Sequence, residues 1–180
     1  MLHLMEVEVL IVCGPAGVGK TSVVNEVAEQ LKRAGLDHAV IDTDALDQVH
    51  PWPPPGLAPS ELSRRNLAAV WRNFRAIGHR RLILAGVFVD LPLEIAWITD
   101  AVHPDRVTAV RLTATEEELE ARVRQREIGS AADAQLRRTF QQARAIAAES
   151  RALTIDTTGE SVAGVARLVL GAAGWLEPAE

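Results

Sequence analysis

The sequence predicts an α/β fold in which helices cover both faces of a five-stranded, mostly parallel sheet. Two observations indicate this class. Short runs rich in Val, Ile and Leu alternate along the chain with longer amphipathic segments, as in parallel strands joined by helices. The chain has 180 residues, of which 48% are hydrophobic and 24% are charged, enough for one compact domain over residues 1–180. We therefore expect three layers, with the sheet in the middle.

The chain begins with an expected strand and helix. Residues 6–13 form a short apolar run that precedes a glycine-rich turn, which is typical of a strand buried on both faces. Cys13, the single cysteine, lies in this run and is expected to be a buried structural thiol. Residues 20–34 carry apolar side chains at helical spacing, and Gly35 stands where a helix usually ends. This pair therefore predicts the first strand–helix unit.

The next segment predicts a short strand followed by a long loop. Residues 38–42 form the strand, and Asp42 and Asp44 follow at its carboxyl end. Residues 49–59 are rich in proline, a composition that excludes a regular helix or a central strand. A helix is then expected over residues 60–77, with a serine at its start as the cap.

The second half of the chain continues the alternation. The pattern of apolar residues predicts a strand at 81–89, a helix at 92–101 and a strand at 106–112. Thr115 followed by three glutamates predicts a helix start, because the hydroxyl caps free amides and acidic residues suit the positive helix end. That helix is expected to reach residue 127. A helix at 131–150, a strand at 152–156 and a helix at 161–171 complete the expected elements.

A glycine-rich loop carries the strongest functional signal. Residues 14–21 match the phosphate-loop pattern G-x-x-x-x-G-K-[ST] between a buried strand and a helix start. Phosphate oxygens need many backbone donors in a concave space, and glycines leave that space open. Lys20 would place a positive charge at the outer phosphates, and the Thr21 hydroxyl would ligate Mg²⁺. The predicted ATP-binding residues are Gly14, Pro15, Ala16, Gly17, Val18, Gly19, Lys20, Thr21 and Ser22. A tight turn alone would not need Lys and Thr at these positions.

Two classes of phosphate-loop protein are disfavoured by motifs that the sequence lacks. No N-K-x-D tetrapeptide, with which GTPases read guanine, occurs in the chain. The strand expected at 81–89 carries no acidic pair of the kind found in motor and AAA-type ATPases, and the first acidic residue after it is Asp90.

The chain resembles the small P-loop kinases and phosphotransferases over nearly its whole length. This group includes gluconate, shikimate, adenylylsulfate and nucleoside monophosphate kinases, chloramphenicol phosphotransferase and zeta-toxin-like kinases. The resemblance rests on the phosphate loop, the aspartates after the second strand, the arginines after the fourth strand and the segment Ile155-Asp-Thr-Thr158. It implies the three-layer α/β/α P-loop NTPase fold with strand order 2-3-1-4-5.

The resemblance also implies roles for particular residues. Asp44 would accept the proton of a substrate hydroxyl, and Asp42 would hold the water shell of Mg²⁺. The alternative for this pair is a solvated turn with helix-capping aspartates. Arg122 and Arg126 would neutralise the transferring phosphate or stack on adenine, the alternative being a surface ladder with neighbouring glutamates. Thr157 would approach the adenine ring.

These features predict a kinase that transfers the terminal phosphate of Mg-ATP to a small-molecule acceptor. An ATPase switch and an ATP-binding module without phosphotransfer are the alternatives.

The formal charge of −5 and the pI near 5.6 argue against nucleic acid as a partner. The first apolar run is too short to span a membrane, so we expect no membrane partner and a cytoplasmic location. Trp52 in the proline-rich loop is a candidate for the acceptor pocket, whereas Trp71 has the helical spacing of a core residue. Neither the acceptor nor the oligomeric state follows from the sequence.

Overall fold

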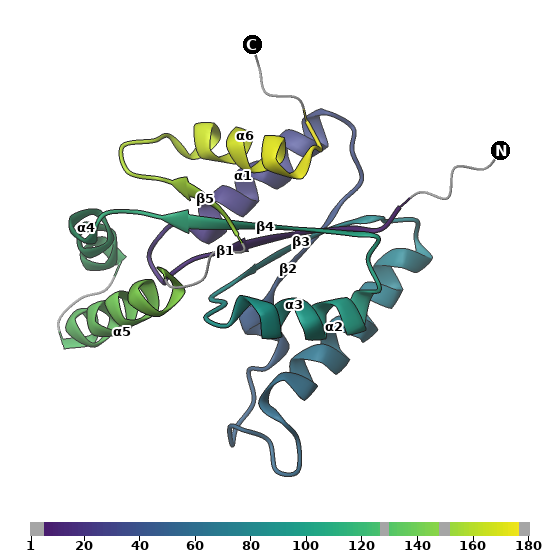
Figure 1. Cartoon of the computed structure of the whole chain (residues 1–180), viewed down its shortest axis with the longest axis horizontal. Helices are drawn as coiled ribbons and strands as arrows, with labels where there is room; N and C mark the ends of the chain where they lie inside the picture. The colour runs from purple at the N-terminus through teal and green to yellow at the C-terminus, as the bar shows by residue number, and fades with distance from the viewer. Residues whose placement is uncertain (1–5, 127–129, 148–151, 177–180) are drawn as a thin grey trace.

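A parallel sheet of five strands forms the centre of the protein. The computed structural model describes residues 6–126, 130–147 and 152–176 (Figure 1). The strand order is β2-β3-β1-β4-β5, and every pairing is parallel. The order that the resemblance implied is therefore confirmed. The strands are β1 (Glu8–Cys13), β2 (Ala39–Asp42), β3 (Arg81–Gly86), β4 (Arg106–Thr113) and β5 (Leu153–Asp156).

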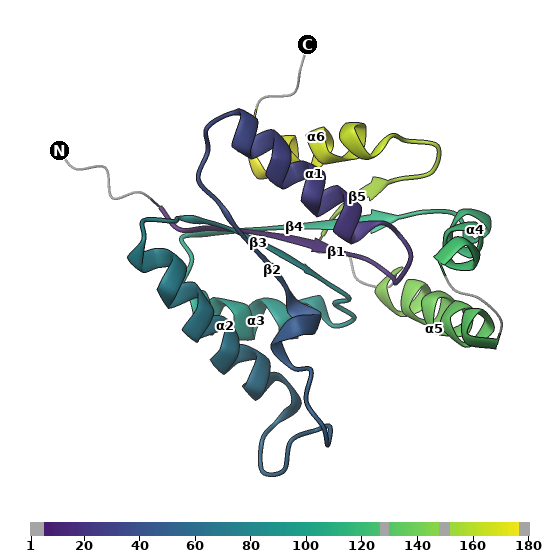
Figure 2. The same cartoon turned by 180° about the vertical axis from the view of Figure 1, so that it is seen from behind.

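Two layers of helices cover the sheet, as Figures 1 and 2 show from opposite sides. Helices α1 (Lys20–Arg33) and α6 (Val162–Ala173) pack together on one face. Helices α2 (Pro59–Ala76) and α3 (Leu91–Val102) pack together on the other. Parallel strands need crossover connections, and α1, α2 and α3 provide the first three of them, whereas α6 follows the last strand. The three-layer prediction is confirmed.

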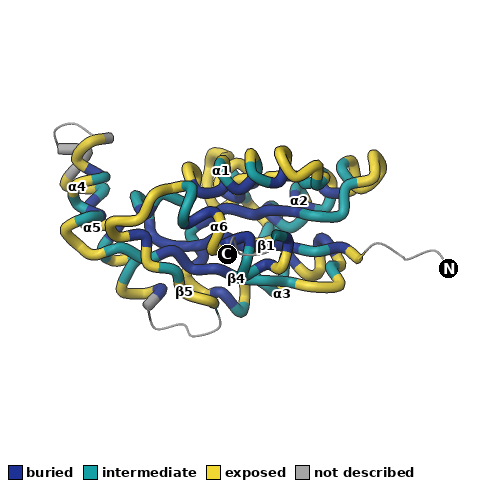
Figure 3. Tube along the Cα trace, turned by 90° about the horizontal axis from the view of Figure 1, so that it is seen from above, coloured by how far each residue is buried: buried dark blue, intermediate teal, exposed yellow. Residues whose placement is uncertain are grey.

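The central strand β1 is buried on both faces because its side chains alternate between two cores. Leu10 and Val12 join the core under α1 and α6, whereas Val9 and Ile11 join the core under α2 and α3. Figure 3 shows buried chain through the middle of the molecule and more exposed helices outside it, while β5 at one edge of the sheet is largely exposed. Cys13 is 1% exposed, which agrees with the buried thiol predicted for it.

The remaining helices lie at the carboxyl ends of the strands. Helix α4 (Glu116–Arg126) follows β4 directly, and α5 (Ser130–Ala147) packs against it (Figure 1). The Thr115 hydroxyl accepts a hydrogen bond from the amide of Glu118 at 3.3 Å, as the predicted cap requires. One 3₁₀ turn, η1 (Thr43–Leu46), follows β2 at the same end of the sheet.

Several element boundaries differ from the predictions by a few residues, and three of these differences have identifiable reasons. Helix α2 begins at Pro59 rather than at a serine cap, because proline suits the first turn of a helix, where its missing N–H is not needed. Strand β3 ends at Gly86 rather than at residue 89, since its neighbours β1 and β2 already end opposite Gly86 and Ala85. Helix α6 runs past residue 171 to Ala173, where Gly174 has a φ of 67°.

The helix predicted at 131–150 is observed from Ser130 to Ala147, and residues 148–150 lie outside the described part of the chain. The helices of the described ranges contain none that is both long and apolar enough to cross a membrane.

Candidate functional site

The loop between β1 and α1 needs its glycines for steric reasons. A Cβ atom on Gly14 would lie 2.6 Å from the backbone oxygen of Leu112. At Gly17 the φ is 80°, and a Cβ atom would lie 2.9 Å from Cγ2 of Val123. Neither separation is tolerated by a real side chain, so the loop holds this curvature only with glycine.

Lys20 begins α1 and turns back over the loop. Its Nζ donates to the carbonyl oxygens of Gly14 and Pro15, both at 3.0 Å. Gly19 stands at the N-cap without a side chain that could cap the helix. The first amides of α1 and the lysine ammonium therefore face the same region, which favours an anion there.

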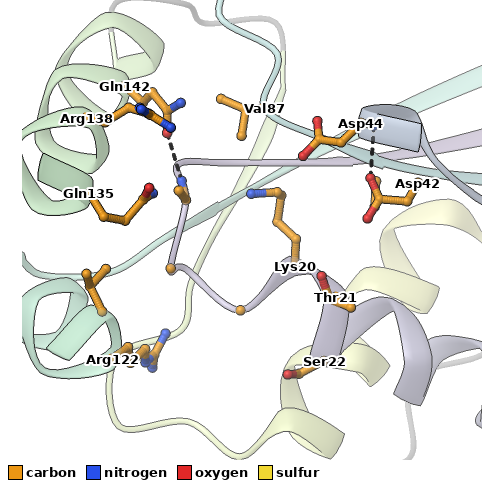
Figure 4. Close-up of a pocket in the computed structure, with 15 residues that line it drawn as sticks. Lys20, Thr21, Ser22, Asp42, Asp44, Val87, Arg122, Gln135, Arg138 and Gln142 are labelled. Carbon is orange, nitrogen blue, oxygen red and sulfur yellow. Dashed lines mark hydrogen bonds between the residues drawn. The ribbon is translucent and has the colours of Figure 1, made fainter. Parts of the chain in front are cut away.

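A cavity of about 500 Å³ opens above this loop, and we call it the loop cavity (Figure 4). Three elements supply its cations, namely Lys20 from α1, Arg122 from α4 and Arg138 from α5. Its remaining lining residues are Ala16, Gly17, Gly19, Thr21, Ser22, Asp42, Asp44, Ala85, Val87, Val123, Gln135 and Gln142. The volume lies within the range of about 300–1,000 Å³ that is usual for small-molecule sites.

Asp42 and Asp44 both line the loop cavity, at the end of β2. Oδ1 of Asp42 accepts from the amide of Asp44 at 3.0 Å and caps η1, so the capping alternative considered for this pair holds for Asp42. Partial burial of the Asp44 carboxyl raises its pKa, and the like charges of Asp42 and Asp47 act in the same direction, while Lys20 opposes them. Asp44 is therefore a better proton acceptor than an isolated aspartate.

Arg122 ties three parts of the site together. Its Nη1 donates to the carbonyl of Val18 at 2.9 Å and to the Thr157 hydroxyl at 3.0 Å. Its Nη2 donates to the Thr157 carbonyl at 3.3 Å and pairs with Glu118 at 2.9 Å. The predicted ladder with Glu118 is thus present, but the same guanidinium also clamps the phosphate loop to the turn after β5. Arg126 is the last residue of α4, and its side chain lies outside the described part of the chain.

Thr157 is buried behind Arg122. Its amide donates to the carbonyl of Thr113 at 2.8 Å, and its own carbonyl accepts from Arg122. Both backbone groups are thus engaged within the protein. The adenine contact of Thr157 stays a prediction, and in this structure the residue anchors Arg122.

Helix α5 brings three residues to the loop cavity that the sequence analysis missed. Gln135, Arg138 and Gln142 all line it, and Oε1 of Gln142 accepts from the amide of Ala16 at 3.0 Å. Their spacing of three and four residues places them on one face of the helix. That polar stripe is the signal that could have identified them.

A second cavity of about 440 Å³ lies next to the loop cavity, and we call it the α3 cavity. Asp44 and Val87 line both cavities. Trp52 lines the α3 cavity, and its place in an acceptor pocket stays a prediction. Trp71 is 2% exposed and belongs to the core, as predicted. The other lining residues of the α3 cavity are Thr43, Asp47, Ser60, Ser63, Phe88, Asp90, Leu93, Glu94 and Trp97.

No protein-family model and no curated protein matches the chain. Solved structures do. A tunicamycin resistance protein from Deinococcus radiodurans matches with a TM-score of 0.66 and 18% identity, over 94% of this chain and 97% of the other. A gluconokinase from Sinorhizobium meliloti 1021 matches with a TM-score of 0.60 and 20% identity, over 93% and 91% of the two chains.

An APS kinase from Mycobacterium tuberculosis, solved in complex with AMPPNP and APS, matches with a TM-score of 0.55 and 18% identity over 93% of this chain and 97% of the other. The chain has the fold of the small P-loop kinases. At these identities the likeness concerns the fold, and the resemblance stated from the sequence is confirmed at that level. Residues 14–21 connect β1 to α1 in this fold, and their role as a phosphate loop stays a prediction.

Proposed function

We propose that the protein is a kinase that transfers the terminal phosphate of Mg-ATP to the hydroxyl of a small-molecule acceptor. The observation that carries the proposal is that Asp44 lines both the loop cavity and the α3 cavity. A carboxylate at this junction stands where phosphate donor and acceptor would meet. The kinases among the structurally similar proteins support the proposal.

The loop cavity is suited to a triphosphate. Lys20 would neutralise the outer phosphates, which requires its ammonium to leave the carbonyls of Gly14 and Pro15. Arg138 adds a second positive charge from α5, and Arg122 fixes the loop by holding the Val18 carbonyl. Catalysis by these groups is positioning and charge neutralisation.

The donor set fits a magnesium ion. The Thr21 hydroxyl and the Asp42 carboxylate line the same cavity, and Mg²⁺ prefers few protein oxygens together with water and phosphate oxygens. No cluster of three or more His, Cys, Asp or Glu ligands is found among the described residues, which excludes a metal cage built from protein side chains alone in that part of the chain. When bound, the ion would neutralise charge on the phosphates.

Asp44 would act on the acceptor. The acceptor oxygen forms a bond to the terminal phosphorus, the bond from that phosphorus to ADP breaks, and the hydroxyl proton passes to the carboxylate of Asp44. The raised pKa of Asp44 favours this transfer, because a more basic carboxylate holds the proton more firmly.

ADP release from Mg-ATP tests the proposal. The purified protein is assayed alone and with a panel of sugars, nucleosides, nucleoside monophosphates, aminoglycosides and chloramphenicol-like alcohols. We expect one acceptor class to raise ADP release well above the basal rate and the phosphorylated acceptor to appear in equal amount. ADP release that no acceptor changes, together with measurable ATP binding, would contradict phosphotransfer and favour an ATPase switch or a binding module.

A further inference from the structure

The walls of the α3 cavity carry one sign of charge. Four carboxylates line it, two from the segment after β2 and two from the start of α3, and no Lys, Arg or His is among the described residues of its lining. These carboxylates are Asp44, Asp47, Asp90 and Glu94. The nearby Arg64 does not offset them, since its guanidinium pairs with Glu61 and Asp100 instead.

Hydrogen bonds hold three of these carboxylates in place. Asp47 accepts from the Ser63 hydroxyl at 3.2 Å, and Asp90 accepts from the Leu93 amide at 3.1 Å. Glu94 accepts from the indole N–H of Trp97. Burial raises the pKa of Glu94, the hydrogen bond from Trp97 opposes this rise, and the charges of Asp90 and Asp47 add to it. Lys20 acts on Asp44 from the loop cavity, but the described lining that surrounds Asp47, Asp90 and Glu94 holds no Lys, Arg or His, so a bound cation would relieve their repulsion.

Apolar surface completes the cavity. Trp52 is 47% exposed and Leu93 is 65% exposed, although both line the cavity together with Trp97 and Phe88. Indole rings attract cations over their faces and pack against the apolar faces of flat or cyclic molecules. The negative charge and the aromatic surface of the α3 cavity therefore both favour a cationic ligand with an apolar face.

From this combination we infer that the acceptor is a hydroxylated organic cation, such as an oligosaccharide that carries amino groups, and that anionic acceptors are excluded. The inference rests on the proposed function. The ammonium groups would lie among Asp47, Asp90 and Glu94, and a hydroxyl would face Asp44 at the junction with the loop cavity. The cavity of about 440 Å³ has room for a molecule larger than a single sugar ring.

Three probes of similar size and different charge test the inference. These are kanamycin, its fully N-acetylated derivative and trigalacturonate, which are cationic, neutral and anionic at pH 7. Phosphotransfer is measured with Mg-ATP, and binding is measured separately by tryptophan fluorescence in the presence of AMPPNP. We expect kanamycin to bind at least about tenfold more tightly than the neutral derivative and trigalacturonate not to bind.

The two measurements separate the inference from the function on which it rests. Binding of kanamycin without phosphotransfer would overturn the kinase proposal and keep the charge preference. Phosphorylation of the neutral or anionic probe as efficiently as kanamycin would overturn the charge preference and keep the kinase. Failure of all three probes to bind overturns the inference.

A matched pair of variants locates the effect in the α3 cavity. Glu94→Gln keeps an oxygen that accepts from Trp97 but removes one charge, and we expect it to raise the KM for kanamycin about tenfold with kcat nearly unchanged. Glu29→Gln removes the same charge from exposed α1 on the opposite face of the sheet, and its KM should match the wild type. An equal rise of KM in both variants, or none in Glu94→Gln, would overturn the inference.

Discussion

Replacement of Asp44 by asparagine separates nucleotide binding from phosphotransfer. Asparagine has nearly the same shape, and the backbone amide that donates to Asp42 remains, so η1 should keep its capped conformation. The variant loses the carboxylate that lines both cavities. Loss of a positioned general base lowers kcat by about 10²- to 10⁴-fold.

In Asp44→Asn the affinity for ATP should increase slightly, in contrast to the decrease expected for kcat. The Asp44 carboxylate would repel the phosphates that Lys20 would attract, so its removal should tighten binding. Two unit charges about 4 Å apart in water interact by about 1 kcal/mol, so we expect a gain below about 1 kcal/mol, which is less than about fivefold in affinity. Calorimetry with Mg-ATP and an assay of ADP release with an active acceptor give the two quantities independently.

The pH profile provides a further test of the same residue. A base must be deprotonated, and the pKa of Asp44 is raised above its ordinary value of 3.8, so kcat/KM should fall as the pH decreases through that raised pKa. This acidic limb should be absent from Asp44→Asn. The control is Asp37→Asn, which removes an exposed aspartate before β2, outside both cavities. Wild-type kcat in Asp44→Asn would refute the role of the carboxylate.

Four further variants test the loop, the clamp and the core. Lys20→Ala should weaken Mg-ATP binding by at least about 100-fold, because it removes the cation of the predicted phosphate loop. Unchanged affinity by calorimetry would contradict the assignment of residues 14–21 to a phosphate loop. Arg122→Lys keeps the charge but cannot span the carbonyls of Val18 and Thr157, so urea denaturation should show a loss of about 1–2 kcal/mol, and an unaltered midpoint would contradict the clamp. Trp71→Ala should cost about 3–5 kcal/mol in the same assay because its ring is buried, whereas Trp52→Ala should cost less than about 1 kcal/mol, and similar losses would refute this difference.

The sequence predicts the fold well because most of its signals are local. Apolar runs such as residues 8–13 and the Thr115 cap are read within one element, and the structure contains both. The strand order depends on contacts between distant segments, and only the resemblance to a known family supplied it. The predicted end of β3 was wrong for the same reason, since the end of a strand depends on where its neighbouring strands end.

The candidate site likewise contains residues that could be predicted from a local motif and residues that are brought together only by the fold. The phosphate loop is one continuous motif, so its residues could be predicted together. Gln142 accepts from the amide of Ala16 across 126 positions of sequence. The polar stripe on α5 marks these side chains as candidates, but it does not indicate which segment of the chain they face. The α3 cavity likewise joins Trp52 of the proline-rich loop to Glu94 of α3, and its negative charge emerges only when those segments fold together.

The position of Asp44 between two cavities has a thermodynamic consequence. If the nucleotide and the acceptor bind in these two cavities as proposed, a group that forms part of both walls would make the two binding equilibria interdependent, since each ligand would alter the electric field at the other. Linkage then requires reciprocity: the factor by which the nucleotide changes acceptor affinity equals the factor by which the acceptor changes nucleotide affinity. A cationic acceptor and an anionic nucleotide would each draw on the same carboxylate, with opposite signs. The size and sign of the coupling between the two ligands would therefore depend on this one side chain as much as on either cavity.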